Sequence, residues 1–450
     1  MASMNMTGGS ISKHLIRYAV PLILSNFFQL TYNAVDSMVA GHFIGRDALA
    51  AQGVANPVMN IVILAISGIC IGASVLMSEF FGAGQTEKLK KEFSTTLIFG
   101  FLFSCAIVLA GILTSRPLLR ALNVSDDLLD SAAAYLRVTF IGAPFTCFYN
   151  AVASALKSVG DSKTPLKFVA FSAGLNVVLD LIFVGALGCG IVSSAATTVV
   201  AEAASAILCI AYVYRKIPLL QLRRGEFHID GPLLKQTLQY GSVTALQQAC
   251  QPIGKLFIQG SINSLGTDAI ATYNAVTKID DFAYIPEQNI SHAMTTFIAQ
   301  NRGANQKQRI MKGFFVGMAM EFGYWIAVCA LTLLLRAPII RLFIKDDQAA
   351  AIVALGSQYL GIMAFCYILP AFTNGFQGFF RGMGSMKTTL IGTLIQITLR
   401  VIFVRILTPT LGILAAPLAC VAGWSVMLVF EIISCVHIKR RELSDFCENG

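Results

Sequence analysis

Residues 135–164, YLRVTFIGAPFTCFYNAVASALKSVGDSKT, carry a pattern that returns at residues 359–388, YLGIMAFCYILPAFTNGFQGFFRGMGSMKT. Equivalent positions share Tyr, Leu, Phe, Asn, Gly, Lys and Thr. Shorter pairs follow the same order at nearly the same separation: GRDALAA at 45 and GTDAIAT at 266, GAGQ at 82 and GANQ at 303, and LDLIFV at 179 and LRVIFV at 399. Ordered matches of this kind indicate an internal repeat. The chain is therefore predicted to consist of two homologous halves.

The composition is that of a membrane protein. The 450 residues are 56% hydrophobic and 13% charged, with a mean hydropathy of +0.69, whereas soluble domains carry roughly 25% charged residues. Only helices and closed barrels satisfy the backbone in lipid, and these apolar runs lack the alternation of barrel strands. We expect an all-α integral membrane fold with twelve transmembrane helices, at residues 15–40, 53–81, 93–114, 134–156, 165–186, 190–214, 238–262, 271–300, 313–335, 356–380, 388–407 and 412–437.

Six spans in each half enter the membrane the same way round, so the expected arrangement is a parallel 6+6 repeat of two six-helix bundles, with a pseudo-twofold axis along the membrane normal. We predict an N-lobe at residues 1–214, a cytoplasmic linker at 215–237 and a C-lobe at 238–450. Most lysines and arginines outside the spans fall on the side of the termini and the linker, which should therefore be cytoplasmic. The pI near 9.0 is thus a topology signal and requires no nucleic-acid partner.

Cofactor and metal motifs are missing from the sequence. The eleven cysteines are scattered through apolar segments without CxxC spacing, and the five histidines form no ligand pattern. We expect no cofactor. The first apolar run is too long for a signal peptide and lacks a cleavage site, so it should remain in the protein. We expect a multi-pass protein of the cytoplasmic (inner) cell membrane that works as a monomer.

The fifth span contains a pair of polar residues whose presence in an apolar segment has to be explained. In GLNVVLDLIFVGALG, residues 174–188, Asn176 and Asp180 are four residues apart and share one helical face. A carboxylate at the bilayer centre costs about 2.5–3.5 kcal/mol on insertion scales. A second acid, Asp36, lies in the first span. The pair of acids either binds a cation or a proton, or pairs with neighbours to fix helix packing.

Three more polar side chains lie in the same half. Asn150 is in the fourth span, and Thr198 and Glu202 are four residues apart in the sixth. We expect the whole set to converge in the outward half of the N-lobe. Glu202 could add a proton site or bind a cationic substrate, and the alternative for it is a place at the lipid interface.

The second half does not repeat this chemistry, because apolar, amide and basic residues stand at the equivalents of Asp36 and the fifth-span pair: Phe257, Gln396 and Arg400. Instead, polar residues with four-residue spacing follow the seventh span: Gln247, Gln251, Lys255 and Gln259. This continuous polar face predicts contacts inside the C-lobe.

The eighth span carries Asp280, Tyr284 and Glu287 at i, i+4 and i+7, on one face. Lys278 is spaced to pair with Asp281, and Lys255 is expected to face Asp280 or Glu287. This group is either a second polar site for substrate or ion, or a buried ion pair that fixes packing. Two further acids have no role that the sequence assigns, Glu321 in the ninth span and Glu431 in the twelfth.

The quoted motifs resemble the multidrug and toxic compound extrusion (MATE) transporters, bacterial and archaeal branch, over essentially the whole chain. The matching segments are PLILSNFFQLTYNAVDSMVAG in the first span, GLNVVLDLIFVGALG in the fifth, KIDDFAYIP in the eighth, and the helix ends EFFGAG and AQNRGA. The resemblance implies a secondary active antiporter that exports organic, cationic or amphipathic compounds in exchange for protons or sodium by alternating access of the two lobes.

The resemblance also implies where coupling occurs. Family acids and asparagines of the N-lobe cation site match Asp36, Asn176 and Asp180, which would hold the proton or sodium, with Asn150 and Thr198 beside them. Some family members bind sodium in the C-lobe through a seventh-span acid. Glutamines and a lysine occupy that neighbourhood here, which argues against a C-lobe sodium site.

Two other function classes stay open. A flippase of a lipid-linked precursor would need several cationic side chains for a diphosphate, and Lys255, Lys278 and Arg400 are the candidates. An integral-membrane enzyme is less favoured, because the sequence has no intramembrane His/Asp pair, HExxH or nucleophile elbow, and no Walker motif supports ATP-driven transport. We therefore expect a transporter and not an enzyme.

Overall fold

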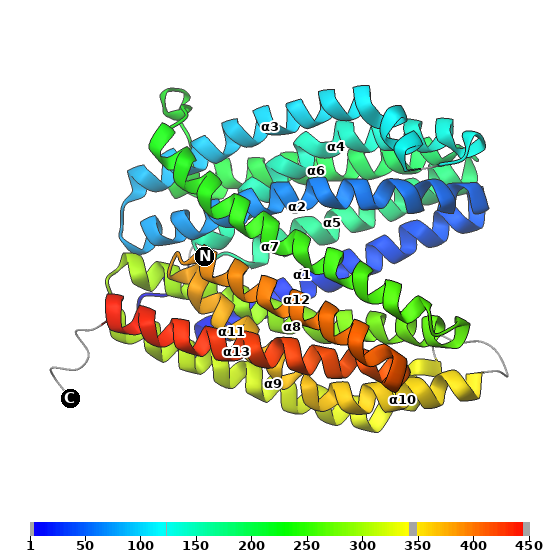
Figure 1. Cartoon of the computed structure of the whole chain (residues 1–450). Coiled ribbons are helices and arrows are strands. Elements are labelled where there is room, and N and C mark those ends of the chain that lie inside the picture. Colours follow the sequence, from blue (N-terminus) through cyan, green and yellow to red (C-terminus); the bar gives the residue numbers. More distant parts are fainter. Residues whose placement is uncertain (1–3, 123, 342–348, 444–450) are drawn as a thin grey trace. The chain divides into compact units, whose positions relative to one another are not determined.

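The computed structural model describes residues 4–122, 124–341 and 349–443, and these form helices joined by short turns, without a strand (Figure 1). The helices are α1 (Ile11–Val39), η1 (Ala40–Ile44), α2 (Arg46–Gly82), α3 (Thr86–Ala121), α4 (Asp126–Ser158), α5 (Lys163–Asp180), η2 (Leu181–Ala186), α6 (Ile191–Lys216), η3 (Pro218–Leu220), η4 (Arg224–Glu226), α7 (Gly231–Asn263), α8 (Thr267–Gly303), α9 (Lys307–Arg341), α10 (Ala349–Cys366), α11 (Ile368–Gly382), α12 (Met386–Leu411), η5 (Gly412–Leu414) and α13 (Ala415–Glu442).

Each of the twelve predicted spans lies within these helices except for at most one residue, so the all-α prediction is confirmed. The tenth predicted span is bent, because α10 and α11 meet at 42° around Tyr367. Seven stretches of the described residues are long and apolar enough to cross a membrane, and eight when this bent pair counts as one. Helices α1, α7 and α8 are not among them, which agrees with their many polar residues. Helix α7 begins at Gly231, inside the range expected for the linker.

The repeated motif GAGQ/GANQ is a helix stop. After α2, Gly84 adopts φ +70° and the Gln85 N–H donates to Phe80 O over 2.9 Å. After α8, Asn305 adopts φ +54° in the same place, and the Gln306 N–H donates to Asn301 O over 2.9 Å. Both ends are left-handed caps, for which glycine and asparagine are the favoured residues. The repeat was therefore visible in the sequence because it encodes the same backbone turn.

Two compact units make up the chain, one of Met1–Asn5 with Val20–Ala245, the other of Met6–Ala19 with Leu246–Gly450. Each of α1 and α7 contributes one part to either unit. In α1 the change of unit falls next to Pro21, which lacks the N–H that an uninterrupted helix would use.

In the first unit, α4 packs against α2, α3 and α6 (Figure 1). The segment between α6 and α7 belongs to this unit and is fastened to α3. Lys90 and Glu226 form an ion pair of 3.2 Å. Ser94 Oγ both donates to His228 O at 3.1 Å and accepts from its N–H at 3.0 Å. The linker is therefore a docked segment.

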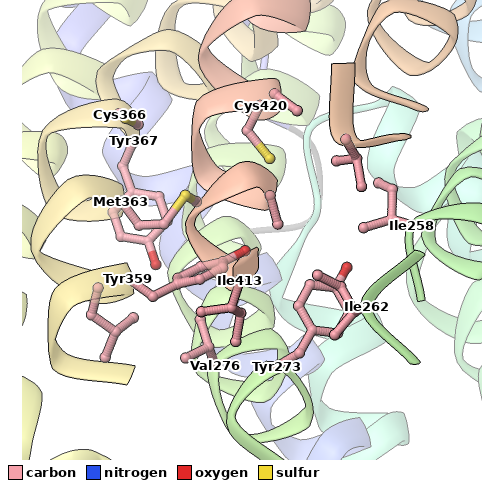
Figure 2. Packing of buried hydrophobic residues seen from close by; sticks show 14 of the residues in the cluster. Ile258, Ile262, Tyr273, Val276, Tyr359, Met363, Cys366, Tyr367, Ile413 and Cys420 are labelled. Atoms are coloured by element: carbon pink, nitrogen blue, oxygen red, sulfur yellow. The ribbon is translucent and has the colours of Figure 1, made fainter. Parts of the chain in front are cut away.

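In the second unit, α8 packs against α9, α10 and α11, and α12 packs against α13. Figure 2 shows the hydrophobic core of this unit, where Tyr359 and Tyr367 are fully buried near Met363 and Cys420. The Tyr273 and Tyr359 rings meet edge to face at 6.5 Å between centroids. Tyrosine rings thus lie inside a largely aliphatic core, and the Tyr367 hydroxyl donates from it to Asp280.

Candidate functional site

Two acids lie together inside the first unit, where α1 supplies Asp36 and α5 supplies Asp180. Asp36 accepts hydrogen bonds from Gln52 Nε2 and from Ser194 Oγ, both at 3.2 Å. Asp180 is 1% exposed and accepts a hydrogen bond from Thr197 Oγ1. The two carboxyl groups also interact with each other. Hydroxyl and amide donors from α2 and α6 thus surround a carboxyl pair.

Asn176 completes this group from one turn before Asp180. With its amide oriented to satisfy both ends, the nitrogen donates to Asp180 Oδ2 at 2.9 Å, and the oxygen accepts from Thr198 N at 3.1 Å and Oγ1 at 3.2 Å. The amide orientation follows from the hydrogen-bond network. Asn176 therefore links the acid on α5 to the backbone of α6.

The backbone changes its winding just beyond both acids. Helix α1 ends three residues after Asp36 and passes into the π-helical turn η1, where the Gly45 N–H donates to Ala40 O at 3.2 Å. Helix α5 passes into the π-helical turn η2 directly after Asp180, and the two turns contact each other. Single π-turns inside helices are rare and recur at functional sites. The presence of two π-turns beside one carboxyl pair therefore makes this end of the first unit a candidate functional site.

Two tyrosines complete the surroundings. The Tyr32 hydroxyl interacts with Thr198 and lies near Asp36, and the Tyr135 hydroxyl interacts with Gln52. Among the described residues, the partners recorded for the two acids are hydroxyl groups, amides and each other, with no lysine or arginine. The site is thus rich in oxygen, and no positively charged side chain from the part of the chain that the structure describes compensates the two acids.

The other two predicted members lie apart from the acids. The Asn150 amide donates to Thr146 O in its own helix at 2.8 Å. Glu202 accepts from Thr146 Oγ1 at 2.5 Å, so its carboxyl group faces α4. The structure therefore joins Asp36, Asn176, Asp180 and Thr198, and places Asn150 and Glu202 in a neighbouring group around Thr146.

The family comparison agrees with this architecture. The family model MatE matches residues 21–182 and 244–406, one match in each half of the repeat. The chain belongs to the MatE family. It is 26% identical over 415 residues to the probable multidrug resistance protein YpnP of Bacillus subtilis, covering 92% of each protein.

Another relative of this MatE protein is named after a different substrate. This chain is 22% identical over 394 residues to the FAD transporter of Shewanella oneidensis, covering 84% of this chain and 85% of that one. A MOP superfamily transporter from Pyrococcus furiosus has a solved structure with the same fold, at a TM-score of 0.90, 21% identity and 98% coverage of both chains. The chain is thus a multi-span membrane protein of a transporter family.

Five residues around the two acids were missed from the sequence: Tyr32, Gln52, Tyr135, Ser194 and Thr197. Ser194 lies one turn before Thr198 on α6, so extending the i, i+4 series backwards could have found it. Thr197 was overshadowed by its neighbour, although its hydroxyl, and not that of Thr198, reaches Asp180. Gln52 had no periodic signal.

In the second unit, the residues of the predicted polar face of α7 lie in different surroundings. Gln247 is buried and donates to Gln377 Oε1 at 2.9 Å and to Thr393 Oγ1 at 3.2 Å, while Thr389 donates back to it at 3.2 Å. Gln251 is exposed. The face is therefore not one continuous contact surface within the unit.

The ion pair of Lys255 differs from the expected one. Its Nζ lies 2.6 Å from Asp281 Oδ1, at the exposed side of α8, and with the expected Asp280 it interacts only electrostatically. Asp280 is instead 6% exposed and accepts a hydrogen bond from Tyr367. Neighbouring positions on a helix diverge by about 100°, so Asp280 points inward while Asp281 points towards α7.

Arg400, Asp280 and Tyr284 form an aromatic and charged group in this unit. The Arg400 guanidinium lies 5.8 Å from the Trp424 ring centroid and interacts with Asp280. Tyr284 packs edge to face on both Tyr367 and Trp424, at 5.7 and 5.9 Å between centroids. Arg400, the repeat equivalent of Asp180, thus faces an acid and a ring.

Proposed function

We propose that this MatE protein is a secondary active efflux antiporter that exports organic, cationic or amphipathic compounds in exchange for protons or sodium. The observation that carries the proposal is the Asp36–Asp180 pair, held by neutral donors without a basic partner among the described residues. Two carboxylates cannot remain close together in a weakly polar interior without a positive ion or a proton. Occupancy of the site therefore has a direct electrostatic effect on α1 and α5.

The donors suit a switch between occupied and empty states. When Asp180 is ionised, Thr197 and Asn176 donate to its oxygens. When a proton or sodium binds, the repulsion between the two acids disappears. A ligand shifts a conformational equilibrium only through different affinities for the two states. The π-turns η1 and η2, next to the acids, are the backbone segments that we propose respond to this change.

The relatives support the substrate class only broadly. The Bacillus relative is named a multidrug resistance protein, and the Shewanella relative is named an FAD transporter. We propose organic cations as the first class to test, and FAD as the competing candidate. We also propose that both termini and the linker are cytoplasmic, with alternating access of the two lobes.

A lipid-precursor flippase is the less favoured candidate. Binding a diphosphate would require cationic side chains whose charges are not already matched. Lys255 is paired with Asp281, and Arg400 faces Asp280 and Trp424. These contacts reduce the positive charge that the two residues offer to an anionic ligand.

Transport by the purified protein in sealed vesicles tests the proposal. Ethidium, norfloxacin and FAD would be loaded separately, and a pH gradient or a sodium gradient would be imposed without the other. We expect gradient-driven movement of at least one organic cation. Movement of FAD alone would contradict the proposed export of organic cations, and no response to either gradient would contradict the proposed antiport.

A further inference from the structure

The second unit contains two glutamates buried at the α8–α9 interface, Glu287 and Glu321. Each is 0% exposed, and none of their four carboxyl oxygens has a hydrogen-bond partner among the described residues. Buried polar groups in folded proteins are nearly always hydrogen-bonded. Two adjacent exceptions of the most strongly hydrated residue type therefore require an explanation.

The register of α8 and α9 brings the two carboxyl groups together. The helices follow each other in the chain and pack against one another, and the Tyr324 hydroxyl on α9 donates to Ala283 O on α8 at 3.0 Å. Glu321 lies one turn before Tyr324, and Glu287 lies one turn after Ala283. Because the helices run antiparallel, these two turns lie opposite each other. The carboxyl groups accordingly interact electrostatically.

The groups around the pair are neutral. Tyr324 comes from α9, Tyr367 from the bend between α10 and α11, and Asn374 from α11. The Asn374 amide approaches Glu287 without forming a hydrogen bond of good geometry. No lysine or arginine among the described residues is recorded as a partner of either glutamate.

Glu431, on α13 of the same unit, shows the contrast. It is also 0% exposed, and neither of its carboxyl oxygens has a hydrogen-bond partner among the described residues, but the Arg381 guanidinium interacts with it electrostatically. The Arg381 guanidinium always carries its charge at ordinary pH. Glu431 therefore resembles Glu287 and Glu321 in its burial. It differs from them in having a basic neighbour.

Glu287 and Glu321 cannot both be ionised in this buried interface. Removing each from water has a high cost, and their mutual repulsion adds to it. A metal cation such as calcium takes about 6–8 oxygen ligands, and the pair with one amide offers fewer. A proton needs only one carboxyl oxygen, and its binding removes one of the two negative charges.

We propose that Glu287 and Glu321 form a proton-binding site in the second unit, in which at least one of the two carboxyl groups carries a proton and is neutral. The site is separate from the Asp36–Asp180 pair of the first unit. It does not depend on the proposed transport function, because it concerns proton occupancy alone. The proton comes from solvent and no bond other than O–H forms.

Infrared difference spectroscopy on the purified full-length protein tests the proposal. The C=O stretch of a protonated carboxylic acid would be followed against pH in the wild type, in Glu287→Gln, in Glu321→Gln and in the double variant. At neutral pH, we expect this band in the difference spectrum obtained by subtracting the spectrum of the double variant from that of the wild type. In each single variant, the remaining acid should lose its proton at lower pH, because the neighbouring carboxyl group is gone.

Glu431→Gln is the matched control, since it removes a fully buried glutamate that has a basic neighbour. Its difference spectrum should lack the protonated-acid band. The proposal is overturned if the double variant leaves the band unchanged, if Glu431→Gln removes as much of it, or if sodium abolishes it at constant pH. Misfolding of both single variants would also contradict it, because glutamine is a neutral isostere of a protonated glutamic acid.

Discussion

Asn176 and Asp180, one helical turn apart on α5, are joined by a hydrogen bond of 2.9 Å from the amide nitrogen to Oδ2. The bond orients the carboxyl group towards α6, where Thr197 donates to its other oxygen. Both Asp180 oxygens thus have neutral donors, while Asp36 approaches from α1. The fifth span keeps this acid in a defined orientation, which a residue facing lipid would not have.

Arg400→Ala should alter substrate range or stability and leave the ion dependence of transport intact. The side chain loses its cation–π contact with Trp424, worth about 0.5–2 kcal/mol, and its interaction with Asp280. Efflux of several cations would be measured with and without a pH gradient. Arg400→Lys is the control that keeps the charge. Loss of the gradient response with transport retained would assign coupling to the second unit.

Gly72→Val should reduce the amount of folded protein. A Cβ at Gly72 would lie 2.6 Å from Gly241 N on α7, so the two backbones could not keep their approach. Overpacking of this kind costs about 1–3 kcal/mol. Thermal unfolding in detergent checks the prediction. The control is Gly53→Ala in the same helix, where no atom lies within 4 Å of the added Cβ; equal stability of both variants would contradict the packing argument.

The docked linker should loosen in acid. The Arg223 N–H and then Lys90 hold the pKa of Glu226 below its ordinary value. A lowered carboxyl pKa contributes stability above the unfolded value, and that contribution is lost as pH falls through the folded value. The anisotropy of a probe on Gly225→Cys should therefore fall at acid pH. Adding Glu226→Gln should remove the pH response, and a response that persists would assign it to another group.

Topology can be tested from the same position. In a cysteine-free background, an impermeant thiol reagent should label Gly225→Cys only from inside the cell, because the lysines and arginines gather on that side. Ser125→Cys, in the exposed turn before α4, should react only from outside. Labelling in the opposite sense would invert the proposed orientation.

The sequence predicted most of the fold because its signals are local or repeated. The left-handed caps at Gly84 and Asn305 recur as short motifs, and the apolar runs locate the helices. The α10–α11 bend at Tyr367 was not predicted, since the run stays apolar through it. The division of α1 and α7 between the two units was also missed, because it depends on contacts distant in sequence.

The carboxyl site was predictable in part for similar reasons. Asn176 and Asp180 are polar exceptions in an apolar helix, and their four-residue spacing fixes a common face. Gln52 and Thr197 could not be ranked above other polar residues, because only the tertiary packing turns them towards the acids. The ion pair of Lys255 with Asp281 was missed because the rotation of α8 about its axis could not be read from spacing alone.

The central claim is that Asp180 and Asp36 act as one coupling unit. Asn at either position keeps the size of the side chain and removes the titratable charge. Asp180→Asn and Asp36→Asn should each accumulate in the membrane at the wild-type level. The double variant should transport no worse than either single one, since residues that act as a unit are not additive.

Gradient-driven efflux and expression, measured in the same vesicles for Asp180→Asn and the wild type, test this claim most directly. We predict that the variant protein is present in normal amount and that its efflux under an imposed pH or sodium gradient falls to background. Efflux at the wild-type level would contradict the account. Failure of the variant to accumulate would likewise assign Asp180 to folding, and not to coupling.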